Sequence, residues 1–392
     1  QLFLLRAVPT HMKSLLPALS LLSAFVSLAS AQQPASPFDR RDANKDGKLV
    51  REELPEPLRK NFDRVDTNKD GFISREESEA MRQNLPQGQK GPGQKGQGPK
   101  GSPRLPEGVK TIANLDYAGS GNPRQALDLF LPEKREGEGL LPVIVFIHGG
   151  GWQGGDKNGG GAKVAPYVAT GKFAGASIAY RLSSEAQWPS QIHDCKAAIR
   201  WLKAHAKEYQ LDPERIAVWG TSAGGHLVAM LGVSDGVKDL EGEIGPHLDQ
   251  TGKVSCVVDF FGPTDMLTMG KDPGFDKHNA ADSAESKLIG GPVLENPDKA
   301  KSASPIEHVT AGDAPHLIVH GSKDPTVAYS QSVDYEKRLE SVGVPAIFLT
   351  VEGAGHGQGF GKSVSDMVTA FLEKQLLGEE REIEDKTVKA GE

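Results

Sequence analysis

The sequence RIAVWGTSAGGHLVAML, residues 215–231, combines a short apolar run, a tight Gly-Ser turn and a second apolar run. The first run predicts a buried strand over 215–219, and the second predicts a helix that begins beside Ser222. A serine in a G-x-S-x-G turn between a strand and a helix is held in a strained conformation that exposes its hydroxyl above the sheet. The flanking glycines let neighbouring backbone pass close by. The stretch therefore predicts a nucleophile elbow with Ser222 as nucleophile.

Two later loops supply candidate partners for this serine. A hydroxyl at neutral pH needs a base to take its proton and a third group to orient that base. Asp324 follows one predicted strand and His356 follows the next, in a glycine-rich loop, which gives the chain order Ser, Asp, His. Asp259 and Asp265 remain alternatives for the acid. Other histidines are expected to have structural roles in helices, strands or the turn after the nucleophile: His193, His205, His226, His316 and His320.

A glycine loop upstream completes the constellation. The apolar run 141–147 predicts a strand, and it ends in the sequence HGGGW at 148–152. Successive glycines leave backbone N–H groups free to turn toward a ligand. Such a loop supplies an oxyanion hole together with the N–H of the residue after the nucleophile. The predicted donors are Gly150, Gly151 and Ala223.

The remaining pattern predicts an α/β domain. Between and after the predicted strands, apolar residues recur at helical spacing, for example around 195–202 and 364–372. Alternating strands and helices give a mostly parallel central sheet flanked by helices on both faces. Strands are expected at 126–131, 143–147, 174–180, 215–219, 255–261, 316–320 and 347–351.

With these motifs in place, residues from about 108 to 377 resemble the acetyl esterase/feruloyl esterase-like (BD-FAE-like) branch of the α/β-hydrolases. The likeness rests on HGGGW at 148–152, on GTSAGG at 220–225 and on LDLFLP at 127–132. It implies the α/β-hydrolase fold and hydrolysis of carboxylic esters by Ser222, His356 and Asp324. Relatives resembling hormone-sensitive lipase carry a helical cap before the first strands. Here the segment before Leu127 is expected to be a linker.

Charge and cysteine content narrow the class of protein further. The 392 residues carry a net charge of −7, which argues against a nucleic-acid partner. Cys195 and Cys256 are the only cysteines, and both fall in predicted buried elements. Two free buried thiols are favoured, with a disulfide between them as the alternative.

The N-terminal region predicts export. An apolar run over 15–28 leads into Ala29-Ser30-Ala31, the small-residue pattern of a signal-peptidase site. Residues 1–31 are therefore expected to be a signal peptide with some upstream residues, and the protein to be secreted or periplasmic. The sequence contains no other long apolar segment, so a transmembrane segment is not expected in the mature chain.

Two similar acidic loops, 42–53 and 66–77, predict a small helical EF-hand pair over 37–82. Each loop has side-chain oxygens at positions 1, 3 and 5, glycine at 6 and glutamate at 12, as calcium binding requires. Val50 offers no side-chain oxygen, so the first loop should bind more weakly. The calcium is expected to have no catalytic part. The predicted ligands are Asp42, Asn44, Asp46, Lys48 and Glu53, then Asp66, Asn68, Asp70, Phe72 and Glu77, with Lys48 and Phe72 using their backbone carbonyls.

The remaining segments differ in composition. Residues 83–106 are rich in Gly, Gln, Lys and Pro and predict a flexible linker. The catalytic domain is expected over 107–378, and the charge-rich residues 379–392 are expected to fray.

Three functions remain open at this point. The leading one is an exported serine carboxylesterase that acts on a small-molecule or polysaccharide-linked ester and removes acetyl or feruloyl groups from polysaccharide. A lipase or peptidase of the same fold is the second. The third is a calcium-dependent interaction or adhesion protein whose hydrolase domain is inactive.

Overall fold

The computed structural model describes residues 46–53, 62–74, 77 and 105–392. The chain divides into two units, Gln1–Pro99 and Lys100–Glu392, and each is described by itself. The predicted signal peptide and most of the predicted linker lie outside the described residues. Within the described residues, no helix combines the length and the apolar character that crossing a membrane needs.

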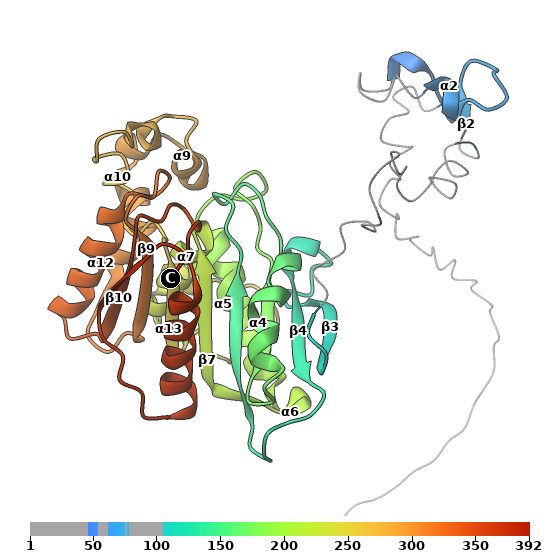
Figure 1. The fold of residues 1–392 in the computed structure, drawn as a ribbon. Coiled ribbons are helices and arrows are strands. Elements are labelled where there is room, and N and C mark those ends of the chain that lie inside the picture. The colour runs from blue at the N-terminus through green and yellow to red at the C-terminus, as the bar shows by residue number, and fades with distance from the viewer. Residues whose placement is uncertain (1–45, 54–61, 75–76, 78–104) are drawn as a thin grey trace, which may run out of the picture. The chain divides into compact units, whose positions relative to one another are not determined.

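The larger unit is built on a nine-stranded sheet with the order β11-β10-β9-β8-β7-β5-β6-β4-β3. Strands from β5 to β11 pair in parallel, whereas β4 pairs antiparallel with both β6 and β3. Figure 1 shows β3 and β4 at one side of the unit and β9 and β10 at the other. The strands are β3 Val109–Asp116, β4 Ala126–Pro132, β5 Leu141–Ile147, β6 Ala174–Ile178, β7 Leu211–Thr221, β8 Cys256–Phe260, β9 His316–Gly321, β10 Ala346–Glu352 and β11 Lys386–Lys389.

The strands expected from the sequence are all present, and the sheet adds one strand at each edge. The segment before Leu127, expected to be a linker, contains β3, which pairs with β4. The expectation that residues 379–392 fray is also wrong, because β11 pairs in parallel with β10 and buries Val388. The larger unit therefore extends to the last residue.

Helices cover both faces of the sheet. Side chains alternate along β5, so Val145 faces α5 and α7 while Ile144 faces α4 and α13. The short helices α9 and α10 lie together at one end of the unit (Figure 1). The helices are α4 Gly161–Val168, α5 Ser190–Ala204, α6 Ala206–Tyr209, α7 Ala223–Val233, α8 Lys238–Glu241, α9 Ala284–Ile289, α10 Pro297–Ser302, α11 Pro305–His308, α12 Tyr329–Ser341 and α13 Lys362–Leu372, with a π-helical turn at Glu373–Leu377.

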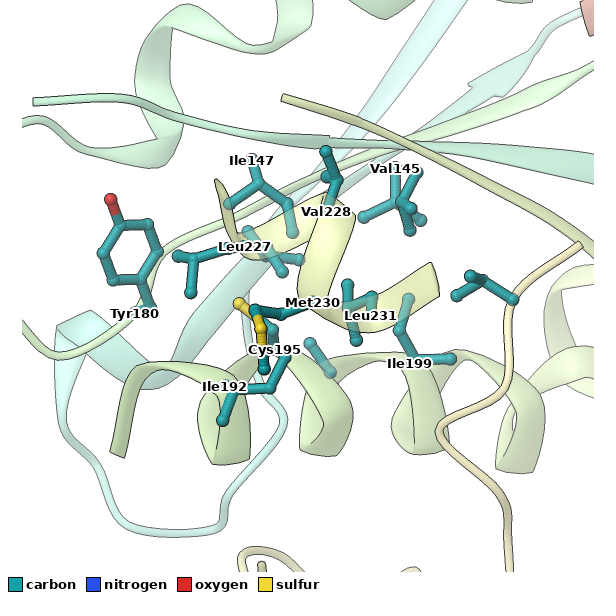
Figure 2. Close-up of a cluster of buried hydrophobic side chains, with 14 of the residues drawn as sticks. Val145, Ile147, Tyr180, Ile192, Cys195, Ile199, Leu227, Val228, Met230 and Leu231 are labelled. Atoms are coloured by element: carbon teal, nitrogen blue, oxygen red, sulfur yellow. The ribbon is translucent and has the colours of Figure 1, made fainter. Parts of the chain in front are cut away.

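The core between α5, α7 and the sheet fixes the position of α7, the helix that follows Ser222. Figure 2 shows Cys195 of α5 packed among apolar side chains that include Leu227 and Met230 of α7. Burying one such leucine stabilises the fold by about 1.5–3 kcal/mol relative to leaving it exposed. Cys195 and Cys256 are both free and buried, which confirms the expectation of two unpaired thiols.

The smaller unit has a minimal core. Strand β1 (Lys48–Leu49) pairs antiparallel with β2 (Ile73–Ser74), as the loops of a paired EF-hand do. Leu49 and Ile73 pack with Phe62 of the short helix α2 (Phe62–Val65). This contact joins the two predicted calcium loops through the described part of the unit.

Candidate active site

Ser222 occupies the sharp turn between β7 and α7. Its backbone has φ 56° and ψ −123°, a conformation that non-glycine residues rarely adopt and that costs about 1–3 kcal/mol. The Ser222 N–H donates to the Phe260 carbonyl at 2.9 Å, which ties the turn to the end of β8. The backbone therefore has the strained geometry that the sequence predicts for a nucleophile elbow.

The glycines around Ser222 are required by close backbone approach. A Cβ on Gly220 would collide with the carbonyl of Gly224, and a Cβ on Gly224 would collide with the carbonyl of Ile147 at the end of β5. A Cβ on Gly225 would meet the carboxylate of Asp259 at the end of β8. The start of α7 thus packs tightly against the ends of β5 and β8, the two strands that flank β7.

Asp324 and His356 form a hydrogen-bonded pair. The Nδ1 atom of His356 lies 2.6 Å from Oδ2 of Asp324, whose side chain is fully buried. The other carboxylate oxygen accepts backbone N–H groups from Thr326 at 2.7 Å and Val327 at 3.0 Å. Burial alone would raise the pKa of Asp324. Hydrogen bonds from His320, His356 and these two amides outweigh burial and lower the pKa well below its ordinary value.

The loops that carry this pair meet because one residue between them has no side chain. A Cβ on Gly321 would lie 2.5 Å from the Ala354 carbonyl and 2.6 Å from the Gly355 carbonyl. The Lys323 N–H donates to the same Ala354 carbonyl at 2.9 Å. The ends of β9 and β10 therefore approach closely enough for the acid and the imidazole to bond.

The end of β8 connects this pair to the elbow. The ring of His356 packs on Phe261 with centroids 4.4 Å apart. The carbonyl of the preceding residue, Phe260, accepts the N–H of Ser222. Within the described residues, neither Oγ of Ser222 nor Nε2 of His356 has a hydrogen-bond partner. The side chain of His356 is 23% exposed, so its ring reaches solvent.

Neither alternative acid contacts His356. Asp259 is fully buried, and its Oδ1 accepts the N–H of Gly262 at 2.9 Å. Burial raises the pKa of Asp259 to about 7, the hydrogen bond from Gly262 acting in the opposite direction. Asp265 accepts the N–H of Leu267 at 3.0 Å. The structure thus pairs the imidazole with Asp324.

A second histidine touches the acid and was assigned only a structural role from the sequence. The Nε2 atom of His320 lies 3.4 Å from Oδ2 of Asp324 and 3.1 Å from the Val327 carbonyl. Its Nδ1 lies 2.7 Å from Oγ of Ser332 on α12. His320 is buried in β9, and it also helps to fix the carboxylate. The sequence signal that could have indicated this contact is that His320 precedes Asp324 by four residues.

The glycine loop after β5 lies against the elbow. A Cβ on Gly149 would be 2.6 Å from the Thr221 carbonyl and 3.3 Å from Cβ of Ser222. Gly150 and Gly151 have φ values of 116° and 57°, which suit glycine. In the described part of the chain, the N–H groups of these two glycines and of Ala223 have no hydrogen-bond acceptor. These N–H groups are therefore available to an oxyanion.

Trp152 anchors this loop to α7, the helix that follows Ser222. Its indole N–H donates to Nδ1 of His226 at 3.2 Å, and Nε2 of His226 donates to the Ala303 carbonyl at 2.7 Å. Both rings are buried, and burial lowers the pKa of His226 to about 4. His226 is thus a neutral imidazole that links the glycine loop to the segment after α10.

The second EF-hand loop has the oxygen donors that calcium requires. One carboxylate oxygen from each of Asp66, Asp70 and Glu77 lies within 4.8 Å of the others. The carboxylates also order the loop, since Asp66 accepts N–H groups from Asp70 at 3.1 Å and Gly71 at 3.0 Å. Asn68 and Phe72 lie in the same turn, where Asp70 contacts both of them. Hard oxygen ligands of this kind fit Ca²⁺.

The first loop is described only from Asp46 onward. Asp46 accepts the N–H of Lys48 at 2.9 Å, and Glu53 accepts the N–H of Val50 at 3.1 Å. The other two predicted ligands, Asp42 and Asn44, lie outside the described residues.

Comparison with known proteins supports both units. Residues 127–339 match the sequence model of the BD-FAE family, and residues 58–77 match that of an EF hand. Esterase LipC of Mycobacterium tuberculosis is 31% identical over 241 residues, covering 60% of this chain and 57% of LipC. The probable carboxylic ester hydrolase LipM of the same organism is 28% identical over 260 residues, with coverages of 64% and 58%. The chain therefore spans less than three-fifths of the length of either relative.

Solved structures give the same grouping. A truncated carbohydrate esterase from gut microbiota is 36% identical, with a TM-score of 0.62, over 68% of this chain and 96% of that one. The propionate-bound esterase Est2 of Thermogutta terrifontis is 24% identical, with a TM-score of 0.54, over 68% of this chain and 94% of that one. This second likeness supports only the α/β-hydrolase fold. Since the family match spans more than half of the 392 residues, this chain belongs to the BD-FAE family.

Proposed function

We propose that this protein is an exported serine carboxylic ester hydrolase in which Ser222, His356 and Asp324 act together. The observation that carries the proposal is the 2.6 Å bond between His356 and Asp324 beside the strained elbow of Ser222. Because Nδ1 of His356 is engaged by the carboxylate, Nε2 is the ring nitrogen left to exchange protons with the serine.

The reaction would proceed by two acyl transfers. Nε2 of His356 takes the proton of Ser222 as its Oγ bonds to the ester carbonyl carbon. The carbonyl oxygen gains the negative charge and accepts N–H groups from Gly150, Gly151 and Ala223. When the C–O bond to the alcohol breaks, His356 returns the proton to the leaving oxygen. Water then repeats both steps on the acyl-enzyme and releases the carboxylic acid.

The substrates proposed are acetyl or feruloyl esters of polysaccharide. The supporting comparison is the neighbour titled a carbohydrate esterase, which matches across almost its whole length. Secretion or periplasmic export is proposed from the apolar run at 15–28 and the small residues that follow it. The EF-hand module is proposed to bind Ca²⁺ without entering the chemistry.

The test is release of nitrophenol from p-nitrophenyl acetate by the purified chain and by Ser222→Ala. Loss of at least 10³-fold in kcat for the variant supports the proposal, since removal of a triad nucleophile costs about 10⁶-fold in a related mechanism. Equal turnover by both proteins would remove Ser222 from the reaction. Absence of turnover in either would favour the adhesion protein with an inactive hydrolase domain. A matched control is Ser363→Ala at the start of α13, which leaves turnover unchanged.

A further inference from the structure

A polar cavity of about 440 Å³ lies beside the glycine loop. It is bounded by Gln153 from that loop, by Ser183 and Gln187 from the segment after β6, and by Lys287 of α9 with the residues that follow it. The volume falls within the usual range of small-molecule sites. The catalytic constellation described above includes none of these side chains.

The cavity adjoins the proposed oxyanion loop through Gln153, the residue that follows Trp152. Gly149 touches the elbow of Ser222, and Gln153 is four residues further along, which is a span of at most about 14 Å. A Cβ on Gly151 would lie 3.5 Å from Cβ of Ala284, so α9 packs directly beside the loop. A group bound in the cavity can therefore belong to the same molecule as an ester at Ser222.

The walls of the cavity are fixed by backbone contacts. Ser183 donates its N–H to the Trp152 carbonyl at 2.8 Å, and Trp188 donates its N–H to the Leu288 carbonyl at 2.8 Å. Gly290, with φ 79°, ends α9, and its missing side chain leaves the space that the amide of Gln187 fills. The three segments are thus held together as one surface.

The lining is suited to hydroxyl groups rather than to hydrocarbon. Ala281 provides the one apolar side chain among the lining residues. Among the described residues, the side chains of Gln153, Ser183, Gln187 and Lys287 have no hydrogen-bond or ion-pair partner. Amides and hydroxyls both donate and accept, and the ammonium donates, so together they match a molecule that carries several hydroxyl groups.

We propose that this cavity is the subsite for the glycosyl part of the ester, with Gln153 and Gln187 as its specificity-determining residues. The inference rests on the proposed function, since it assigns the alcohol side of the same reaction. An acyl chain would bury hydrocarbon against amides and hydroxyls whose hydrogen bonds would then be lost, which is unfavourable. The sugar lies in the polar cavity, and the small acyl group lies at Ser222.

The test compares two acetate esters that differ only in the alcohol: an acetylated xylo-oligosaccharide and p-nitrophenyl acetate. For Gln153→Ala/Gln187→Ala, the ratio of kcat/KM for the sugar ester to that for the nitrophenyl ester falls at least tenfold, mainly through KM. Gln250→Ala, in the loop before β8, is the matched control and keeps the ratio within twofold. A ratio within twofold of the unmodified protein in the double variant overturns the inference, whatever the activity on nitrophenyl acetate.

A binding measurement separates this inference from the proposed function. Full-length Ser222→Ala is titrated calorimetrically with xylotetraose, with and without Gln187→Leu, and thermal unfolding confirms that both proteins are folded. Saturable binding that Gln187→Leu weakens at least tenfold, or about 1.4 kcal/mol, supports the subsite even if the unmodified chain hydrolyses no ester. Hydrolysis of nitrophenyl acetate without any binding of xylotetraose leaves the esterase standing and overturns the subsite.

Discussion

The indole N–H of Trp152 donates to Nδ1 of His226 at 3.2 Å, so the glycine loop after β5 is hydrogen-bonded to α7, the helix that follows Ser222. His226 also links α7 to the segment after α10, since its Nε2 donates to the Ala303 carbonyl at 2.7 Å. Trp188 packs on the same imidazole with ring centroids 5.5 Å apart. The position of the proposed oxyanion donors thus depends on a buried imidazole that takes no part in proton transfer.

Replacing this imidazole should impair both catalysis and stability. His226→Phe keeps an aromatic ring but leaves the buried indole N–H and the Ala303 carbonyl without partners, at about 1–3 kcal/mol each. We expect kcat on p-nitrophenyl acetate to fall roughly tenfold or more as the loop loses its position, with a smaller change in KM. Urea unfolding and steady-state kinetics measure the two effects. His193→Phe is the control, because His193 is half-buried on α5 and its Nε2 lies 2.9 Å from the Asp239 carbonyl, outside the glycine loop. Equal losses in both variants would contradict this role.

The acid of the proposed triad can be identified by conservative substitution. Asp324→Asn removes the charge that holds the His356 imidazole, and kcat should fall about 10³–10⁴-fold while the fold is retained. Asp265→Asn should stay within about threefold of the unmodified protein, because the carboxylate of Asp265 accepts the Leu267 N–H and does not contact His356. Kinetics on p-nitrophenyl acetate decide between them. A large loss in Asp265→Asn together with an active Asp324→Asn would exchange their assignments.

Asp259 should make stability depend on pH. Burial raises its pKa from 3.8 to about 7, so the folded state binds this proton more tightly than the unfolded state. The contribution of this proton to the free energy of unfolding is complete below pH 3.8. It is lost as the pH rises toward 7, and the free energy of unfolding then falls by at most about 1.4 kcal/mol per pH unit. The amide side chain in the Asp259→Asn variant cannot lose a proton. The free energy of unfolding of this variant, relative to that of the unmodified protein, should therefore increase between pH 5 and pH 8. Urea titrations that show a constant difference over this range would disprove the assignment.

The sequence predicted those features that short local patterns encode. Ser222 and the glycine loop stand in contiguous motifs, and Asp324 and His356 follow apolar strands in the order that the fold requires. The partnership of Trp152 and His226 joins residues 74 positions apart, which no local pattern reports. The edge strands were missed because neither shows the two-residue alternation of apolar and polar side chains that predicts a half-buried strand. In β3 every residue is exposed or half-buried, and β11 buries Val388 alone.

The second EF-hand loop should bind calcium without affecting ester hydrolysis. Hydrogen bonds from the Ser74 amide, Thr67 and Asn68 outweigh burial and lower the pKa of Glu77 to about 2, so this carboxylate is ionised at neutral pH. Glu77→Gln should weaken calcium binding at least tenfold in calorimetry of the full chain, whereas Glu107→Gln should not. Chelation with EDTA should leave turnover of p-nitrophenyl acetate within about twofold. A loss of more than tenfold on chelation would place calcium in the catalytic cycle.

The C-terminal residues should be needed for a stable sheet. Beyond the pairing of β11 with β10, the carboxylate of Asp385 accepts the Phe348 N–H at 2.9 Å, and the Glu392 carbonyl accepts the Ser363 N–H at 2.9 Å. Truncation after Gly378 removes these bonds and uncovers the edge of β10, which favours association between copies. We expect the melting temperature to fall on the order of 5 °C or more, with increased light scattering on heating.

Val388→Asp in the full chain should reproduce part of this loss of stability, because it places a charge in the space that the Val388 side chain fills at 4% exposure. Thr387→Asp, at an exposed position of the same strand, is the control and should leave the melting temperature unchanged. A truncated protein that melts at the same temperature as the full chain would contradict a stabilising role for residues 379–392.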